Sequence, residues 1–182
     1  MNQRADRYRR LSQRFTEILA AVPADRWQAP SPCDGWSALD VVAHVVRTQA
    51  EFLTRMGFES PTVDESDVLA TWPAVRDAVQ TRLDHPADAE REYDGWFGRT
   101  TFEATIDTFY SMDLTVHGWD VARATDLGPF LQIPGDELAT IRAAVEQLGD
   151  SARMPGVFGP ALPVTDDADE QTRLLADIGR KA

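Results

Sequence analysis

Residues 100–125, TTFEATIDTFYSMDLTVHGWDVARAT, contain the longest uninterrupted helical pattern in the chain. At about 100° per residue, one face of this predicted helix carries both apolar and ionisable side chains. The members of that face are Phe102, Ile106, Phe109, Asp113, His117, Asp120 and Ala124. No segment of the chain has the pattern of a central strand, so a helix of this length predicts a bundle of helices.

Two aspartates and a histidine interrupt the apolar stripe of this helix. Burying an unpaired carboxylate is costly, so these side chains need hydrogen bonds, an ion or solvent in a cleft. Asp113 and His117 are one turn apart on the same face, and both can point at one cation. Zinc-type metals bind histidine nitrogen and carboxylate oxygen, and a catalytic site has three protein ligands. The other interpretation is a buried Asp–His hydrogen bond within one helix.

A third ligand would come from the two remaining histidines. His85 directly precedes Pro86 at a predicted helix end, where a histidine commonly caps carbonyl groups or lies in solvent. His44 is the better candidate, because it lies in the middle of a helix predicted for residues 37–56 between two apolar sides. The other members of its stripe are Asp40, Arg47 and Glu51. By spacing alone, such a charged stripe is more typical of a solvated face.

The rest of the chain is also predominantly helical in pattern. Apolar residues at steps of three and four predict helices before Pro23, from Ser66 to before Pro86, over 136–149 and over 172–178. Pro73 is expected to kink or start the third of the long helices. Residues 90–99 indicate a loop or a small hairpin, and residues 154–164 are rich in Pro and Gly. We expect one domain over 1–182, an all-α four-helix bundle with short C-terminal helical additions.

The composition excludes several classes of protein. The chain has 182 residues, with 18 Lys plus Arg against 30 Asp plus Glu and a formal net charge of −12. Such a charge repels nucleic acid and anionic membranes, so we expect neither as a partner. The single cysteine, Cys33, cannot form an internal disulfide, which fits a cytoplasmic protein. The Arg-rich start is not followed by the apolar run of a signal peptide, and no stretch reaches the ~18 apolar residues of a membrane span.

Four further residues lie near the candidate ligands in the sequence. Asp120 follows His117 by about one turn and would orient it, as metal-bound histidines usually require; a partner for Arg123 or for a loop amide is the alternative. Cys33 stands in a turn before Trp36, either as a thiol near a cleft or as a packed turn residue. Trp36 and Trp119 would wall a ligand pocket, although aromatic residues are more often core.

Two stretches, SPCDGWSALDVVAHVV (31–46) and DLTVHGWDVARAT (113–125), together resemble the DinB-like superfamily. They are most similar to the actinobacterial branch that carries the metal-binding domain of mycothiol-dependent maleylpyruvate isomerases. The ending GVFGPALPV followed by LLADIGRKA resembles a subfamily of uncharacterised proteins in that branch. The resemblance covers almost the whole chain. It implies a four-helix bundle with one divalent metal, zinc or alternatively nickel, held by His44, Asp113 and His117.

The chain departs from the isomerases in two respects. Their pattern has glutamate at the position of Asp113, and the shorter side chain weakens or repositions that ligand. They also have an additional C-terminal domain, for which we expect no room here, so maleylpyruvate isomerisation itself is not expected. We expect instead a metal-dependent thiol S-transferase or isomerase, with a small thiol such as mycothiol, a small-molecule electrophile and a possible homodimer as partners. The alternatives are a metal-dependent hydrolase and a non-catalytic metal-binding module.

Overall fold

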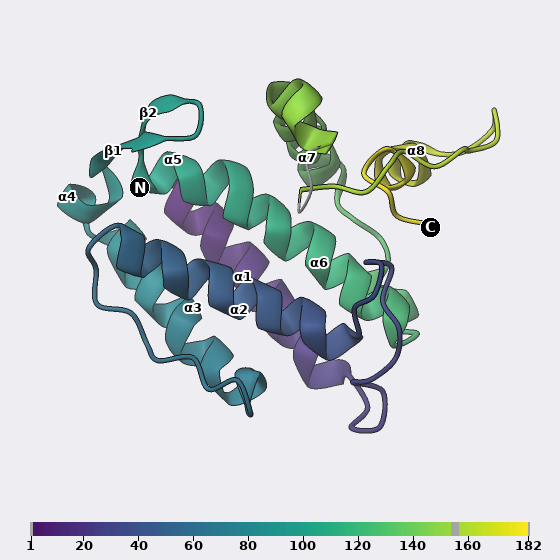
Figure 1. The fold of residues 1–182 in the computed structure, drawn as a ribbon, viewed down its shortest axis with the longest axis horizontal. Helices are drawn as coiled ribbons and strands as arrows, with labels where there is room; N and C mark the ends of the chain where they lie inside the picture. Colours follow the sequence, from purple (N-terminus) through teal and green to yellow (C-terminus); the bar gives the residue numbers. More distant parts are fainter. Residues whose placement is uncertain (1, 154–156, 182) are drawn as a thin grey trace.

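Helices dominate the computed structural model, which describes residues 2–153 and 157–181 (Figure 1). Four of them lie side by side: α1 (Gln3–Ala21), α2 (Ala38–Arg55), α3 (Val68–Asp84) and α6 (Ser111–Ala124). Both α1 and α2 pack against α3 and α6, so the four helices close into a bundle. The all-α bundle predicted from the sequence is confirmed.

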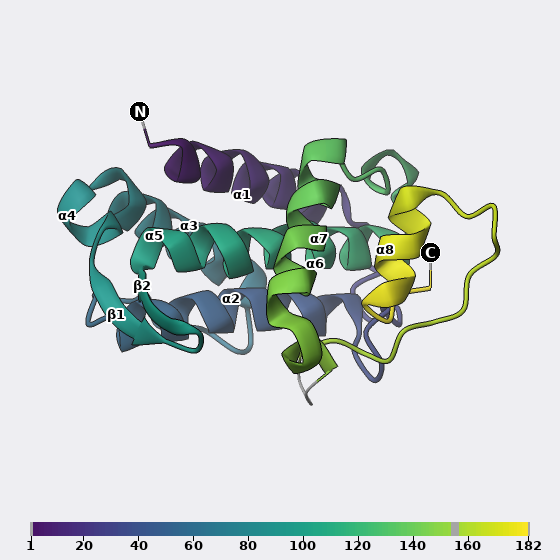
Figure 2. The same cartoon turned by 90° about the horizontal axis from the view of Figure 1, so that it is seen from above.

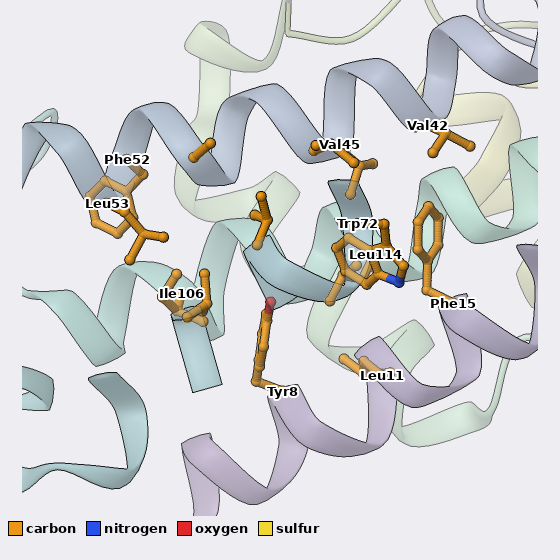
Figure 3. Close-up of a cluster of buried hydrophobic side chains, with 14 of the residues drawn as sticks. Tyr8, Leu11, Phe15, Val42, Val45, Phe52, Leu53, Trp72, Ile106 and Leu114 are labelled. Atoms are coloured by element: carbon orange, nitrogen blue, oxygen red, sulfur yellow. The ribbon is translucent and has the colours of Figure 1, made fainter. Parts of the chain in front are cut away.

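Large apolar side chains from all four helices fill the centre of the bundle (Figure 3). Phe15 of α1 meets Trp72 of α3 edge to face, with ring centroids 5.0 Å apart. Two side-chain hydrogen bonds join helices within this core: Tyr8 donates its hydroxyl proton to Gln49, and the Trp72 indole donates to Thr16. A core of this kind fixes how α2 faces α6, because interior side chains interdigitate with little free space.

Local signals set the helix ends. Ser37 accepts a hydrogen bond from the Asp40 amide, and the Asp40 carboxylate accepts one from the Ser37 amide, so a capping box starts α2. Helix α3 starts after Asp67, whose side chain accepts from the Ala70 amide. Pro73 therefore lies inside α3 and does not start it.

The segment predicted as one helix over 100–125 is divided into three parts and a strand. Strand β1 (Glu92–Gly95) pairs with β2 (Gly98–Thr101) as an antiparallel hairpin in which Glu92 faces Thr101. After β2 the chain continues as α5 (Phe102–Thr105), a π-helix (Ile106–Tyr110) and then α6. The expected helix therefore starts later, and the hairpin accounts for residues 90–99.

The π-helix changes which side chains face the core. A π turn contains one residue more than an α turn, so it shifts the helical register of everything that precedes α6. Tyr110 stacks on the core residue Phe52 at 4.9 Å, whereas Phe109 stacks on Phe97 of the hairpin loop at 6.2 Å. The prediction that Phe109 shares a face with Asp113 and His117 is therefore wrong, because it assumed an unbroken α-helix.

The C-terminal part of the chain packs outside α6 (Figure 2). It contains α7 (Gly135–Leu148), which crosses α6, and α8 (Glu170–Asp177). The short helical segments are α4 (Pro86–Ala89) and the 3-10 turns Gly128–Phe130 and Gly149–Arg153. A second apolar cluster joins these helices to α6: Met112, Val116, Trp119, Ile133, Leu138, Ile141, Ala144, Leu174, Leu175 and Ile178.

Two points complete the comparison with the sequence. Of the predicted Pro- and Gly-rich segment 154–164, residues 154–156 lie outside the described residues, and 157–164 form neither helix nor strand. Among the described residues, every helix is too short or too polar to span a bilayer.

Candidate metal centre

The bundle brings His44 of α2 together with Asp113 and His117 of α6. The Nε2 atom of His44 lies 3.9 Å from Asp113 Oδ2, and the Nε2 atom of His117 lies 4.0 Å from Asp113 Oδ1. The two imidazole rings are 5.1 Å apart. The nitrogen and oxygen atoms that these three residues offer to a cation all lie within 4.8 Å of one another. The three residues predicted as ligands thus form one cluster.

The spacing of these donor atoms fits a small divalent cation after a minor adjustment. Ligand atoms at about 2.0–2.2 Å from a tetrahedral metal lie roughly 3.3–3.6 Å from each other. The donor atoms of the cluster lie up to 4.8 Å apart, so the side chains would move closer together when a metal binds. The His44 and Asp113 side chains are each 29% exposed, whereas that of His117 is 9% exposed. The cluster is therefore anchored in the bundle and open to solvent on one side.

Close helix packing behind His117 supports its position. At Gly118, an added Cβ atom would lie 3.1 Å from Ile18 and 3.5 Å from Phe15 of α1. A larger residue would push α1 and α6 apart, so glycine allows α1 to pack against this side of α6. The adjacent His117 then faces α2 and His44.

The second nitrogen of His117 contacts a buried carboxylate. His117 Nδ1 lies 3.0 Å from Asp120 Oδ2, and the Asp120 side chain is fully buried. The same carboxylate accepts hydrogen bonds from Arg180 at 3.2 Å and from the Cys33 thiol at 3.2 Å. Asp120 therefore lies behind His117, as expected from the spacing, and the alternative partner Arg123 has no contact with it among the described residues.

Arg180 was not among the candidates that the sequence suggested. It lies beyond the end of α8, where helical periodicity carries no information, yet only 6% of its surface is exposed. Its guanidinium contacts both Asp120 and Cys33. The one sequence signal is a glycine directly before it, which is typical of a helix end followed by a sharp turn.

The two histidines of the cluster differ in charge. Burial lowers the pKa of His117, but its hydrogen bonds to Asp120 and Cys33 and the charge of Asp113 outweigh burial and raise the pKa to about 10. Burial and the neighbouring His117 lower the pKa of His44. At neutral pH, His44 is therefore a neutral imidazole with a free lone pair, and His117 carries a proton that a metal would have to displace.

The electrostatic environment of Asp120 agrees with this assignment. Burial raises the pKa of its carboxyl, but the hydrogen bond to His117 and the charge of Arg180 more than offset burial and leave the pKa below its ordinary value. Asp120 is thus a carboxylate that accepts hydrogen bonds. A carboxylate in this position fixes which nitrogen of a ligating histidine carries the proton.

A second group of donor atoms, from Cys33, His117 and Asp120, also lies within 4.8 Å. The Arg180 guanidinium is 3.4 Å from the Cys33 sulfur and 3.2 Å from Asp120 Oδ2. Because a positive charge already contacts two of the three donors, a metal cation would be repelled there. The group of His44, Asp113 and His117 is the better candidate.

The remaining candidates lie in three different environments. Trp36 is 36% exposed, and its ring lies 5.1 Å from that of His44 and 6.4 Å from that of His117, so it borders the cluster. Trp119 is buried in the second apolar cluster with α7 and α8, so it is a core residue and does not border the candidate metal ligands. The His85 side chain is 65% exposed at the end of α3, as expected.

Comparison with known proteins relates part of the chain to a family. Two mycobacterial relatives are uncharacterized proteins of Mycobacterium tuberculosis. Rv0738 is 28% identical over 180 residues, which is 95% of each chain. Rv0036c is 26% identical over 161 residues, which is 75% of this chain and 57% of the relative, so the chain spans just over half of that protein. No solved structure matches the chain.

A family model matches the first part of the chain. The matched residues, 8–73, cover most of α1, all of α2 and the start of α3. They include His44 and exclude Asp113 and His117. The resemblance predicted from the sequence is confirmed over this range, where the chain matches the mycothiol maleylpyruvate isomerase N-terminal domain.

Proposed function

We propose that this protein binds one divalent metal through His44, Asp113 and His117, and that it is an S-transferase or isomerase that uses a low-molecular-weight thiol. One observation carries the proposal: three donor residues from two helices converge within 4.8 Å, and the far nitrogen of His117 is held by a buried carboxylate. The match to a domain of mycothiol-dependent isomerases supports a thiol of the mycothiol type.

Each residue of the cluster has a definite role in the proposal. His44 and His117 donate nitrogen lone pairs from the neighbouring helices α2 and α6, and Asp113 supplies the negative charge between them. Asp120 accepts a hydrogen bond from the Nδ1–H group of His117 and so leaves Nε2 for the metal. When bound, a divalent metal would supply Lewis acidity that keeps the thiol in its nucleophilic thiolate form at neutral pH.

The half-exposed side of the cluster supports a small-molecule site. Three protein ligands leave at least one coordination position free, and catalytic metal sites are open in this way. His44 and Asp113 are the more exposed members, and Trp36 stands beside His44 at the solvent side. The indole offers an apolar surface next to the position where a thiol would enter.

Asp113 also bears on the difference from the isomerases. The shorter aspartate still reaches between both histidines, with its two oxygens 3.9 and 4.0 Å from their Nε2 atoms. Replacement of glutamate by aspartate is therefore compatible with a three-residue metal site in this chain.

The test is spectroscopic. The protein is purified without chelators, its metal content is measured, and cobalt is then exchanged into the site. Addition of mycothiol or a close analogue is expected to produce a sulfur-to-cobalt charge-transfer band, and the His117→Ala protein is expected to give none. A wild-type protein that holds no divalent metal would contradict the site assignment.

Two other results would replace the thiol-transferase activity. If no thiol perturbs the cobalt spectrum and the metal-loaded protein hydrolyses esters or amides, the protein is a hydrolase. If neither activity is found and no exogenous ligand reaches the cobalt ion, the metal has a structural role.

A further inference from the structure

We propose that Arg180 is a positioning residue for this centre: it holds the Asp120 carboxylate in the orientation that accepts a hydrogen bond from the Nδ1–H group of His117. The C-terminal end of the chain would then control the geometry of a ligand on α6. This inference rests on the proposed function only for the role of His117 as a metal ligand. The contacts among the three side chains stand independently of any metal.

The contacts form a chain of hydrogen bonds. Arg180 approaches both carboxylate oxygens of Asp120, with Nη2 at 3.2 Å from Oδ2 and Nε at 3.4 Å from Oδ1. His117 Nδ1 contacts the same Oδ2 atom at 3.0 Å. A guanidinium that binds both oxygens of a carboxylate fixes the rotation of the carboxylate plane. The direction in which His117 can donate is thereby fixed as well.

Burial makes this contact necessary. Asp120 is fully buried and Arg180 is 6% exposed. A buried carboxylate without a cationic partner is strongly disfavoured, so Asp120 would rotate, take up a proton or admit water if Arg180 were absent. Cys33 would not replace the charge, because its thiol offers only a weak hydrogen bond.

The backbone holds Arg180 in place for this contact. Gly179 ends α8 with φ of +82°, and its Cα approaches that of Gly159 so closely that a Cβ atom would lie 2.8 Å from it. The Arg180 amide then donates to the Leu175 carbonyl at 2.8 Å, and its guanidinium also donates to the Ile178 carbonyl at 2.8 Å. This turn is typical of a helix end and directs the side chain back to the bundle.

The two views of the fold agree with this arrangement. The C-terminal end and α8 lie at the same end of the bundle as the connection between α1 and α2, which contains Cys33 (Figures 1 and 2). Arg180 bridges these two segments through its contact with the Cys33 sulfur at 3.4 Å. Residues far apart in the sequence therefore meet behind His117.

A simpler role for Arg180 is to fasten the C-terminal segment to the bundle. That role predicts a loss of stability when Arg180 is replaced, with no change at His117. A positioning role predicts a change at His117 in the folded protein. The experiment must therefore read His117 directly.

We would compare Arg180→Met and Arg180→Lys with the wild type and with Arg173→Met as the matched control. Arg173 lies on the exposed side of α8, and within the described part of the chain it donates to the backbone carbonyls of Ala168 and Asp166. The first readout is the Nδ1 proton of His117 in the metal-free protein, followed by NMR on histidine labelled with nitrogen-15. The second is zinc affinity, measured by competition with a chelator.

In Arg180→Met, the slowly exchanging Nδ1 proton is expected to disappear, and zinc affinity is expected to fall by about 10- to 100-fold, as for other residues that orient metal-bound histidines. Arg180→Lys should retain part of both signals, because an ammonium supplies the charge but not the planar fork. Arg173→Met should match the wild type. An unchanged Nδ1 proton and unchanged zinc affinity in folded Arg180→Met would overturn the inference.

A double variant separates positioning from fastening. If Arg180 acts through Asp120, Asp120→Asn with Arg180→Met should bind zinc no more weakly than Asp120→Asn alone. Independent, additive losses would contradict the inference. The double variant also removes the buried carboxylate charge that Arg180 neutralises. If circular dichroism shows that Arg180→Met does not fold, the double variant and Arg180→Lys are used in its place. If the wild type binds no zinc, the proposed function fails, and the Nδ1 proton still decides the inference.

Discussion

The two nitrogen atoms of His117 lie in contrasting environments. On the Nδ1 side, the buried Asp120 carboxylate accepts hydrogen bonds from the buried Arg180 and from the half-buried Cys33. On the Nε2 side, the Asp113 oxygen is 4.0 Å away, beyond a hydrogen bond, and the neighbouring side chains are partly exposed. The Nδ1 atom of His117 is therefore in a hydrogen bond, whereas its Nε2 atom is beyond hydrogen-bonding distance of Asp113. A histidine held in this way is prepared to donate its outer lone pair.

The largest expected effect is that of His117→Ala, which removes the residue shared by both sides. The binding free energy of zinc in a structural site with four ligands is ~10–16 kcal/mol. One ligand therefore accounts for about 3 kcal/mol, or about a hundredfold in affinity. His117→Ala also leaves Asp120 without one of its partners. We expect zinc affinity to fall by more than this hundredfold, measured by chelator competition. Retention of full metal occupancy would exclude His117 as a ligand.

His44→Ala tests the open side of the cluster, where His44 Nε2 lies 3.9 Å from Asp113. We expect a loss of about a hundredfold in zinc affinity, the share of one ligand. The matched control is His85→Ala, because His85 is exposed at the end of α3 and belongs to neither group of candidate metal donors among the described residues. Equal losses in the two variants would show that the His44 effect is not specific.

Asp113→Asn keeps an oxygen in the same place and removes its charge. An amide oxygen is a poorer donor to a divalent metal than a carboxylate, so we expect zinc affinity to fall by about tenfold. Asp113→Glu should be tolerated, because glutamate offers the same carboxylate oxygens to a divalent metal. Unchanged affinity in Asp113→Asn would transfer the role of carboxylate ligand to Asp120.

The pH dependence of metal binding follows from the proton on His117. Because its pKa is raised to about 10, zinc must displace one proton throughout the neutral range. Affinity should therefore rise with pH, by about tenfold per unit between pH 6 and pH 8, and fall on acidification. Competition titrations at several pH values measure the slope. A flat profile would mean that no proton leaves the site when the metal binds.

The smallest effect is expected for Cys33→Ala. The thiol contacts Asp120 and Arg180 but carries none of the charge that pairs them. Loss of one weak hydrogen bond of ~0.5–1 kcal/mol predicts a change of about two- to fivefold in zinc affinity. A loss comparable to that of His44→Ala would instead favour the donor group of Cys33, His117 and Asp120 as the metal site.

Local sequence patterns predicted the features that depend on a single helix. The helix boundaries of α2 follow from the Ser37 cap and the spacing of apolar residues, and the pair of Asp113 and His117 follows from residues one turn apart. The pattern failed at Phe109, because a π turn is not visible as a change in apolar spacing. The hairpin at residues 92–101 was expected only as one of two alternatives, since turn glycines fit both.

The sequence by itself determined the helical class, the net negative charge and the Asp–His pair, because these depend on composition and on neighbours along one helix. Only the tertiary structure brought His44 to that pair, since by spacing alone its charged stripe is more typical of a solvated face. Only the tertiary structure likewise placed Arg180 against Asp120, 60 residues away in the chain. Contacts of this kind arise when packed helices exclude water and a buried charge must find its partner, wherever the chain supplies it.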